Sequence, residues 1–203
     1  MLLITFGFCF ISYYNLNFQS FQVNNPWCFY MFLGISCAIV LVIQCCGRDF
    51  SGSNPLNLIL LAIFTICYSY IISFFTSIYA NAYGAPLVLE ALFLTIALVL
   101  ALTFYAFVAR IDFSALAGVL IVVILAFILF GISFAFTLSP ALHTLYMTLG
   151  IIVGGIIIVF DTIMIADGER GCSLDDPVFG ALILYLDIIR IFLYILMAMG
   201  KKK

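Results

Sequence analysis

The sequence predicts an all-α membrane protein: a polytopic bundle of seven helices, with the first helix shortened and the last one central. Of its 203 residues 67% are hydrophobic and only 8% are charged, and the mean hydropathy is +1.35. A soluble domain carries roughly 25% charged residues. No polar stretch is long enough to fold as a separate water-exposed domain. The net charge is −2 and no basic patch is present, which excludes nucleic acid as a partner.

Six apolar runs are long enough to cross a bilayer, since a spanning helix needs about 20 apolar residues. A seventh run, at the start, is too short. It lacks the basic residues and the cleavage site of a signal peptide, so we expect the chain to begin partway through a first span. Short loops favour one bundle over residues 1–203. The expected spans are residues 1–14, 27–46, 56–79, 85–108, 115–137, 142–166 and 179–200.

The arginines indicate an orientation. Arg48, Arg110 and Arg170 follow the second, fourth and sixth runs, whereas the loops after the first, third and fifth runs hold no Lys or Arg. The positive-inside rule then places the N-terminus and the arginine-bearing loops in the cytosol. Seven crossings would put the lysines of residues 201–203 on the opposite side, against that rule. Either the last run re-enters the membrane, or the tail is a tolerated exception.

Two aspartates lie inside apolar runs, Asp161 in the sixth and Asp187 in the seventh. A charge at bilayer depth costs roughly 3 kcal/mol or more, and such residues normally face a protein interior or a water-filled cavity. The functional interpretation is a paired site that shares a proton, responds to pH and attracts or repels a cation. The structural alternative is that each carboxylate accepts a hydrogen bond from a neighbouring helix.

Arg190 stands three residues after Asp187, close enough on a helix for a direct ion pair. That pair would keep Asp187 ionised and weaken proton sharing. Arg190 could instead bridge both aspartates as a lock that opens on protonation, or extend toward the interface. Because Asp187 and Arg190 suit lipid poorly, we expect the last run to be central in the bundle.

Glu90 and the glycines at 150–155 each have a structural and a functional interpretation. Glu90 follows Pro86, and its carboxylate either complements a helix N-terminus or lies at a pore mouth. Gly150-x-x-x-Gly154, followed by Gly155, predicts close helix packing. Such packing would hold Asp161 in a fixed position.

No enzyme motif is present. The sequence has no G-x-S-x-G, H-E-x-x-H or P-loop, so we expect no enzymatic activity. The aspartates lie in FDT and YLDII, whereas intramembrane aspartyl proteases carry YD and GxGD. The cysteines form no C-x-x-C pair, and we expect no metal site and no cofactor.

Four stretches resemble the Bax-inhibitor/lifeguard family of transmembrane proteins, in order and over nearly the whole chain. FGALILYLDIIRIFLYIL in the last run resembles the family's A-L-x-L-Y-L-D-I-I-N-x-F-L, and FDT at Asp161 resembles its Y-D-T. VLEALFLTIALVLALTFYAFVARIDFS and NPLNLILLAIFT resemble two further family segments. The lifeguard and Golgi anti-apoptotic branches are the most similar.

The resemblance implies a seven-helix bundle with a central last helix, a calcium leak regulated by pH through Asp161 and Asp187, and suppression of apoptosis. It implies an intracellular membrane, endoplasmic reticulum or Golgi, with the plasma membrane as the alternative. Expected partners are membrane lipid, calcium ions and apoptosis-regulating membrane proteins. Arg48 corresponds loosely to an arginine that the family is thought to use as a latch.

One departure matters for function: Arg190 stands where the family usually has an uncharged residue. A fixed positive charge there favours ionised Asp187, so pH gating would be shifted or lost. The rival hypothesis is a non-conducting scaffold that regulates cell death by binding partner proteins. A proton-coupled transporter is a third, but no inverted repeat supports it.

Overall fold

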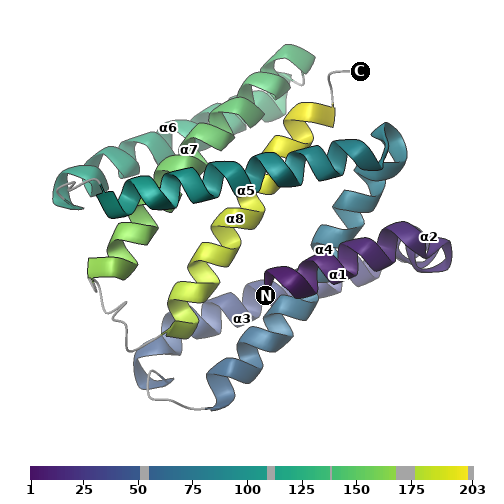
Figure 1. The fold of residues 1–203 in the computed structure, drawn as a ribbon, viewed down its shortest axis with the longest axis horizontal. Coiled ribbons are helices and arrows are strands. Elements are labelled where there is room, and N and C mark those ends of the chain that lie inside the picture. The colour runs from purple at the N-terminus through teal and green to yellow at the C-terminus, as the bar shows by residue number, and fades with distance from the viewer. Residues whose placement is uncertain (51–54, 109–112, 138, 168–176, 201–203) are drawn as a thin grey trace. The chain divides into compact units, whose positions relative to one another are not determined.

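The computed structural model describes residues 1–50, 55–108, 113–137, 139–167 and 177–200. These ranges are helical apart from short connections, and each of the seven expected runs coincides with a helix, so the predicted fold class is confirmed (Figure 1). In chain order the helices are α1 Leu2–Tyr14, α2 Leu16–Asn24, α3 Pro26–Phe50, α4 Pro55–Tyr83, α5 Ala85–Val108, α6 Phe113–Thr137, α7 Pro140–Asp167 and α8 Pro177–Gly200.

Within the described ranges, five helices are long and apolar enough to cross a membrane. These spans are Pro26–Ile43, Leu58–Tyr83, Ala85–Val108, Ala141–Ala166 and Phe179–Gly200. Helix α6 is 25 residues long, and its described apolar part is Gly118–Ile132. Helix α1 has 13 residues, or about 20 Å at 1.5 Å per residue. It is therefore shorter than the hydrocarbon core, as the sequence predicts.

Helix α2, over residues 16–24, was not predicted from the sequence. The segment LNFQSFQVN is rich in amides and has no apolar run. Its start is fixed by the Asn15 side chain, which accepts hydrogen bonds from the backbone N–H groups of Asn17 and Phe18 at 3.1 and 3.2 Å. This N-cap satisfies donors that a helix start otherwise leaves unpaired.

Proline and glycine mark the helix boundaries. Proline suits the first turn of a helix, where its missing N–H would have no partner. Gly84 separates α4 from α5 with φ 94°, a left-handed conformation that favours glycine. The five prolines all lie at the first or second position of a helix: Pro26, Pro55, Pro86, Pro140 and Pro177.

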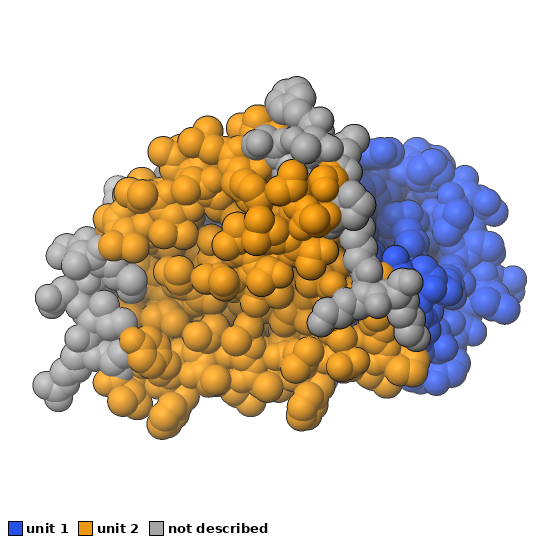
Figure 2. Space-filling model, turned by 90° about the horizontal axis from the view of Figure 1, so that it is seen from above, with its two compact units in different colours: residues 1–85, 175–182 blue, residues 86–174, 183–203 orange. Residues whose placement is uncertain are grey.

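The chain divides into two compact units, coloured separately in Figure 2. The first holds residues 1–85 and 175–182, and the second holds residues 86–174 and 183–203. In the first unit α4 packs against α1, α2 and α3. In the second unit α7 packs against α6, and side chains of α5 and α8 pack onto α7.

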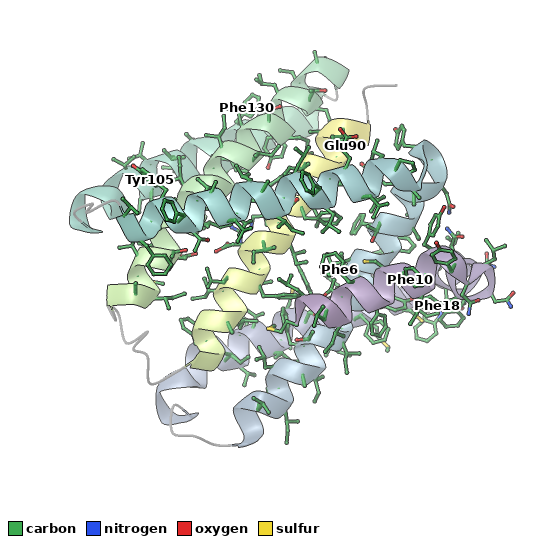
Figure 3. The ribbon with its side chains drawn as sticks, viewed as in Figure 1. Phe6, Phe10, Phe18, Glu90, Tyr105 and Phe130 are labelled. Atoms are coloured by element: carbon green, nitrogen blue, oxygen red, sulfur yellow. The ribbon has the colours of Figure 1, made fainter. Side chains whose placement is uncertain are left out.

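The first unit buries both polar and apolar side chains: Thr65 and Ser69 of α4 lie inside it together with Phe64 and Ile72. Thr5 and Ser12 of α1 are buried, whereas Phe6 and Phe10 of the same helix are exposed (Figure 3). Three buried hydroxyl side chains of α4 bond to α1 or α2: Ser69 to Thr5, Thr76 to Cys9 and Ser73 to Gln22. Large apolar side chains that face outward are typical of a helix surface in contact with lipid.

Candidate functional site: a carboxyl pair on α7 and α8

Packing of α8 onto α7 positions the two aspartates. A Cβ atom built on Gly150 would lie 2.9 Å from the Tyr194 ring, and one on Gly154 would lie 2.9 Å from Cγ1 of Ile191. As the residue number rises on α7 it falls on α8, so the two helices are antiparallel. The glycine motif therefore packs closely, as predicted, with bulky side chains of α8 seated over glycines of α7.

This packing brings Asp161 and Asp187 together, as the sequence predicted. Asp187 is buried, with 3% of its surface exposed, and Asp161 is half-buried. Their carboxyl groups are close enough for a side-chain hydrogen bond. The buried Oδ2 of Asp187 has no hydrogen-bond partner in the described part of the chain. Two carboxyl groups this close can share one proton, which then makes a hydrogen bond between them.

Arg190 pairs with Asp187 along α8. Its Nη1 lies 3.4 Å from Oδ1 of Asp187, and the Arg190 side chain is 44% exposed. This is the local ion pair expected at a spacing of three residues. The two oxygens of Asp187 thus have different neighbours: Oδ1 faces the guanidinium group, and Oδ2 is the atom without a donor.

Apolar side chains flank Asp161 along α7. Phe160 and Met164 of α7 pack with Leu120 of α6, and Ile183 of α8 lies against this cluster. On another side of α7, Val159 and Ile163 pack with Ala106 of α5. The hydroxyl of Thr162, next to Asp161 in sequence, is buried without a hydrogen-bond partner in the described residues. Apolar packing thus covers two sides of α7 next to Asp161, which is itself half-buried.

Two turns along α8 from Asp187 lies an aromatic cluster that sequence reasoning missed. Phe127 of α6 stacks on Tyr146 of α7 at 4.6 Å between ring centroids, and it meets the ring of Tyr194 edge-on at 6.1 Å. A Cβ on Gly131 would lie 2.9 Å from the hydroxyl oxygen of Tyr146. The glycines at 131 and 150 were the available signal, because each leaves room for a ring on the next helix.

The remaining predicted residues are not part of this pair. Glu90 is the sixth residue of α5 and is exposed (Figure 3). Because it lies beyond the first turn, it does not complement the helix N-terminus, and that interpretation is wrong. The pore-mouth role stays a prediction. Arg48 belongs to α3, and its side chain lies outside the described residues.

The donor set at the pair is small. In the part of the chain that the structure describes, no group of three or more His, Cys, Asp or Glu side chains could hold a metal ion. Calcium in a tight site takes six to eight oxygen ligands. Two carboxyl groups can attract a passing cation, but they do not enclose one.

A family model described as "Inhibitor of apoptosis-promoting Bax1" matches residues 1–203. Protein lifeguard 3 of Homo sapiens is 28% identical over 189 residues, which are 91% of this chain and 59% of that protein. Protein lifeguard 3 of Mus musculus is 27% identical over 184 residues, 88% of this chain and 58% of that protein. Bax inhibitor 1 of Schizosaccharomyces pombe is 30% identical over 200 residues, 98% of this chain and 71% of that protein. The chain thus spans less than two thirds of the length of the lifeguard relatives.

Proposed function

Since the chain belongs to the Bax-inhibitor family, the inhibitors of apoptosis-promoting Bax1, we propose that it is a pH-sensitive calcium leak channel that suppresses apoptosis. The membrane would be that of the endoplasmic reticulum or Golgi, with the plasma membrane as the alternative. The observation that carries the proposal is the carboxyl pair of Asp161 and Asp187 within the apolar helices α7 and α8. Intramembrane ionisable residues mark ion pathways and proton relays.

The pair offers a simple two-state switch. With one shared proton, the two carboxyls bond to each other and hold α7 against α8. Without it, two like charges face each other and repel, while Asp187 keeps its contact with Arg190. The second state would loosen the helix pair and present negative charge to a cation. Lowering the calcium content of an intracellular store is how this leak would modulate cell death.

The small donor set favours a leak over storage of calcium. Conduction needs a site that attracts an ion but also releases it. Two carboxyls beside one guanidinium group meet that need better than a closed cage of oxygen ligands would.

Calcium efflux from proteoliposomes tests the proposal. The chain should release trapped calcium faster than empty vesicles do, at a rate that varies with pH. Asp187→Asn cannot carry the second negative charge and should flatten that pH dependence. Folded protein with no efflux at any pH would refute the channel.

The alternative function is a non-conducting scaffold that binds apoptosis-regulating membrane proteins. The Arg190–Asp187 ion pair favours it, because both partners lie on one helix and can neutralise each other without any ion path. A scaffold predicts that Arg190→Asn changes stability and leaves calcium flux at the level of empty vesicles. A channel predicts a folded variant with an altered pH profile.

A further inference from the structure

The short helix α2 has three distinct sides. At about 100° per residue, the exposed residues Asn17, Ser20 and Asn24 fall on one polar stripe. Leu16 and Val23, 73% and 56% exposed, lie together on one flank of that stripe, and Phe21, 48% exposed, lies on its other flank. The opposite side faces the protein: the buried Gln22 and the half-buried Phe18 lie there.

The protein-facing side is held by hydrogen bonds. Ser12 of α1 donates to Oε1 of Gln22 at 2.6 Å, and Nε2 of Gln22 donates to Oγ of Ser73 on α4 at 2.9 Å. The Phe18 ring meets the Tyr70 ring edge-on at 6.1 Å. One buried amide thus joins α2 to α1 and α4, so the directions of its other two sides are fixed.

Chain continuity fixes the depth of α2. A single residue, Asn25, separates it from α3, whose apolar span begins at Pro26. Asn25 closes the end of α2 by donating from Nδ2 to the carbonyl of Phe21 at 3.0 Å, and it accepts from Nε1 of Trp27 at 3.3 Å. A helix joined so closely to a membrane span must lie near the end of that span.

Aromatic side chains surround this boundary. Amphipathic rings concentrate at the two membrane–water interfaces. Four such residues near α2 are exposed, by 38–69%: Tyr13, Tyr14, Trp27 and Tyr30. No Asp, Glu, Lys or Arg occurs before Arg48, so nothing in this segment carries the cost of burying a charge.

We infer that α2 is an interfacial helix whose partner is the lipid surface on the side opposite the Arg48 end of α3. Its flank of Leu16 and Val23 inserts at the headgroup–acyl boundary, and its stripe of Asn17, Ser20 and Asn24 faces water. Because the segment is uncharged, the contact depends on apolar burial and not on anionic lipid.

The single tryptophan of the chain makes the placement measurable. In lipid nanodiscs, Trp27 fluorescence should be quenched more by lipids brominated near the headgroup than by lipids brominated deep in the chain. A Trp27→Phe background then accepts one tryptophan on each side of α2, at the exposed positions Val23 and Ser20. Ile35, 39% exposed within the α3 span, gives the matched deep control.

Iodide in water should quench Ser20→Trp severalfold more than Val23→Trp, and shallow bromolipid should show the reverse order. Ile35→Trp should respond mainly to deep bromolipid. Omitting anionic lipid should leave all these ratios unchanged.

Equal iodide quenching at positions 20 and 23 would place α2 in water and overturn the inference. Absence of iodide quenching at both would place it inside the membrane or under another protein segment, with the same consequence. Unchanged helicity and a monodisperse elution profile establish that each variant is folded. The Trp27 measurement itself uses the unmodified chain.

Discussion

The two carboxylate oxygens of Asp187 have different neighbours, and the proposed function depends on this carboxyl group. Oδ1 lies 3.4 Å from Nη1 of Arg190, whereas Oδ2 is buried with no hydrogen-bond partner in the described residues. The sequence predicted all three residues, because charges inside apolar runs stand out against lipid. It could not predict which oxygen faces which partner, since that depends on the register of α7 against α8.

Replacing Arg190 tests the balance at this residue. Arg190→Asn removes a pair whose arginine is 44% exposed, so we expect a loss of about 1 kcal/mol in unfolding free energy. A fully buried pair would lose about 3–5 kcal/mol. Denaturant titration in detergent measures the difference, with Arg190→Lys as the charge-retaining control. Without the guanidinium charge beside the carboxyl pair, the pH profile of calcium flux should shift. An unmoved profile would show that Arg190 does not act on the pair.

At the scale of helices, glycines on α7 set the distance to α8. Gly150→Ala would place a Cβ 2.9 Å from the Tyr194 ring. Such overpacking costs about 1–3 kcal/mol. Gly118→Ala is the matched control, because nothing lies within 4 Å of its Cβ, and alanine there should stabilise α6 by about 0.5–1 kcal/mol. Thermal unfolding in detergent should therefore move in opposite directions for the two variants. Destabilisation of equal size in both would contradict the packing described here.

In the first unit, hydrogen bonds add to the aromatic contacts that α2 and α3 make with α4. Gln22→Leu removes the two bonds to Ser12 and Ser73. Interhelical hydrogen bonds in membrane proteins contribute about 0.6 kcal/mol each on average and up to roughly 2 kcal/mol. We expect a loss of about 1–2 kcal/mol, measured by denaturant unfolding. Ser20→Ala is the control, because Ser20 bonds only to carbonyls of its own helix. A neutral Gln22→Leu would mean that α2 is held by something else.

The sequence predicted some helices and missed others for clear physical reasons. Apolar runs of about 20 residues predicted α3 to α8, because length and hydropathy alone select spans. Helix α2 has neither signal: its helicity depends on the Asn15 cap and on the tertiary bonds of Gln22. The packing of Tyr146 on Gly131 and of Tyr194 on Gly150 was not predicted. Glycine spacing indicates that another helix comes close, but it does not indicate which side chain of that helix makes the contact.

At the scale of the whole molecule, the side of the membrane on which the C-terminus lies depends on whether α8 crosses it. It is a continuous helix of 24 residues, and about 20 suffice to cross the hydrocarbon core. Of the two alternatives left by the arginine pattern, we therefore expect crossing, with the lysine tail on the side opposite Arg48, Arg110 and Arg170. A pH-sensitive fluorescent protein fused after residue 203 reports this, as its signal follows the pH of the compartment it occupies. A cytosolic reporter would favour the re-entrant alternative.

The most direct measurement of the central claim is the pH midpoint of calcium efflux in a double-variant cycle. It compares the unmodified chain with Asp161→Asn, Asp187→Asn and the double variant. If the two carboxyls act as one proton-sharing unit, each single variant removes the pH dependence and the second substitution adds nothing. Independent, additive shifts, or an unchanged midpoint in both single variants, would contradict the account.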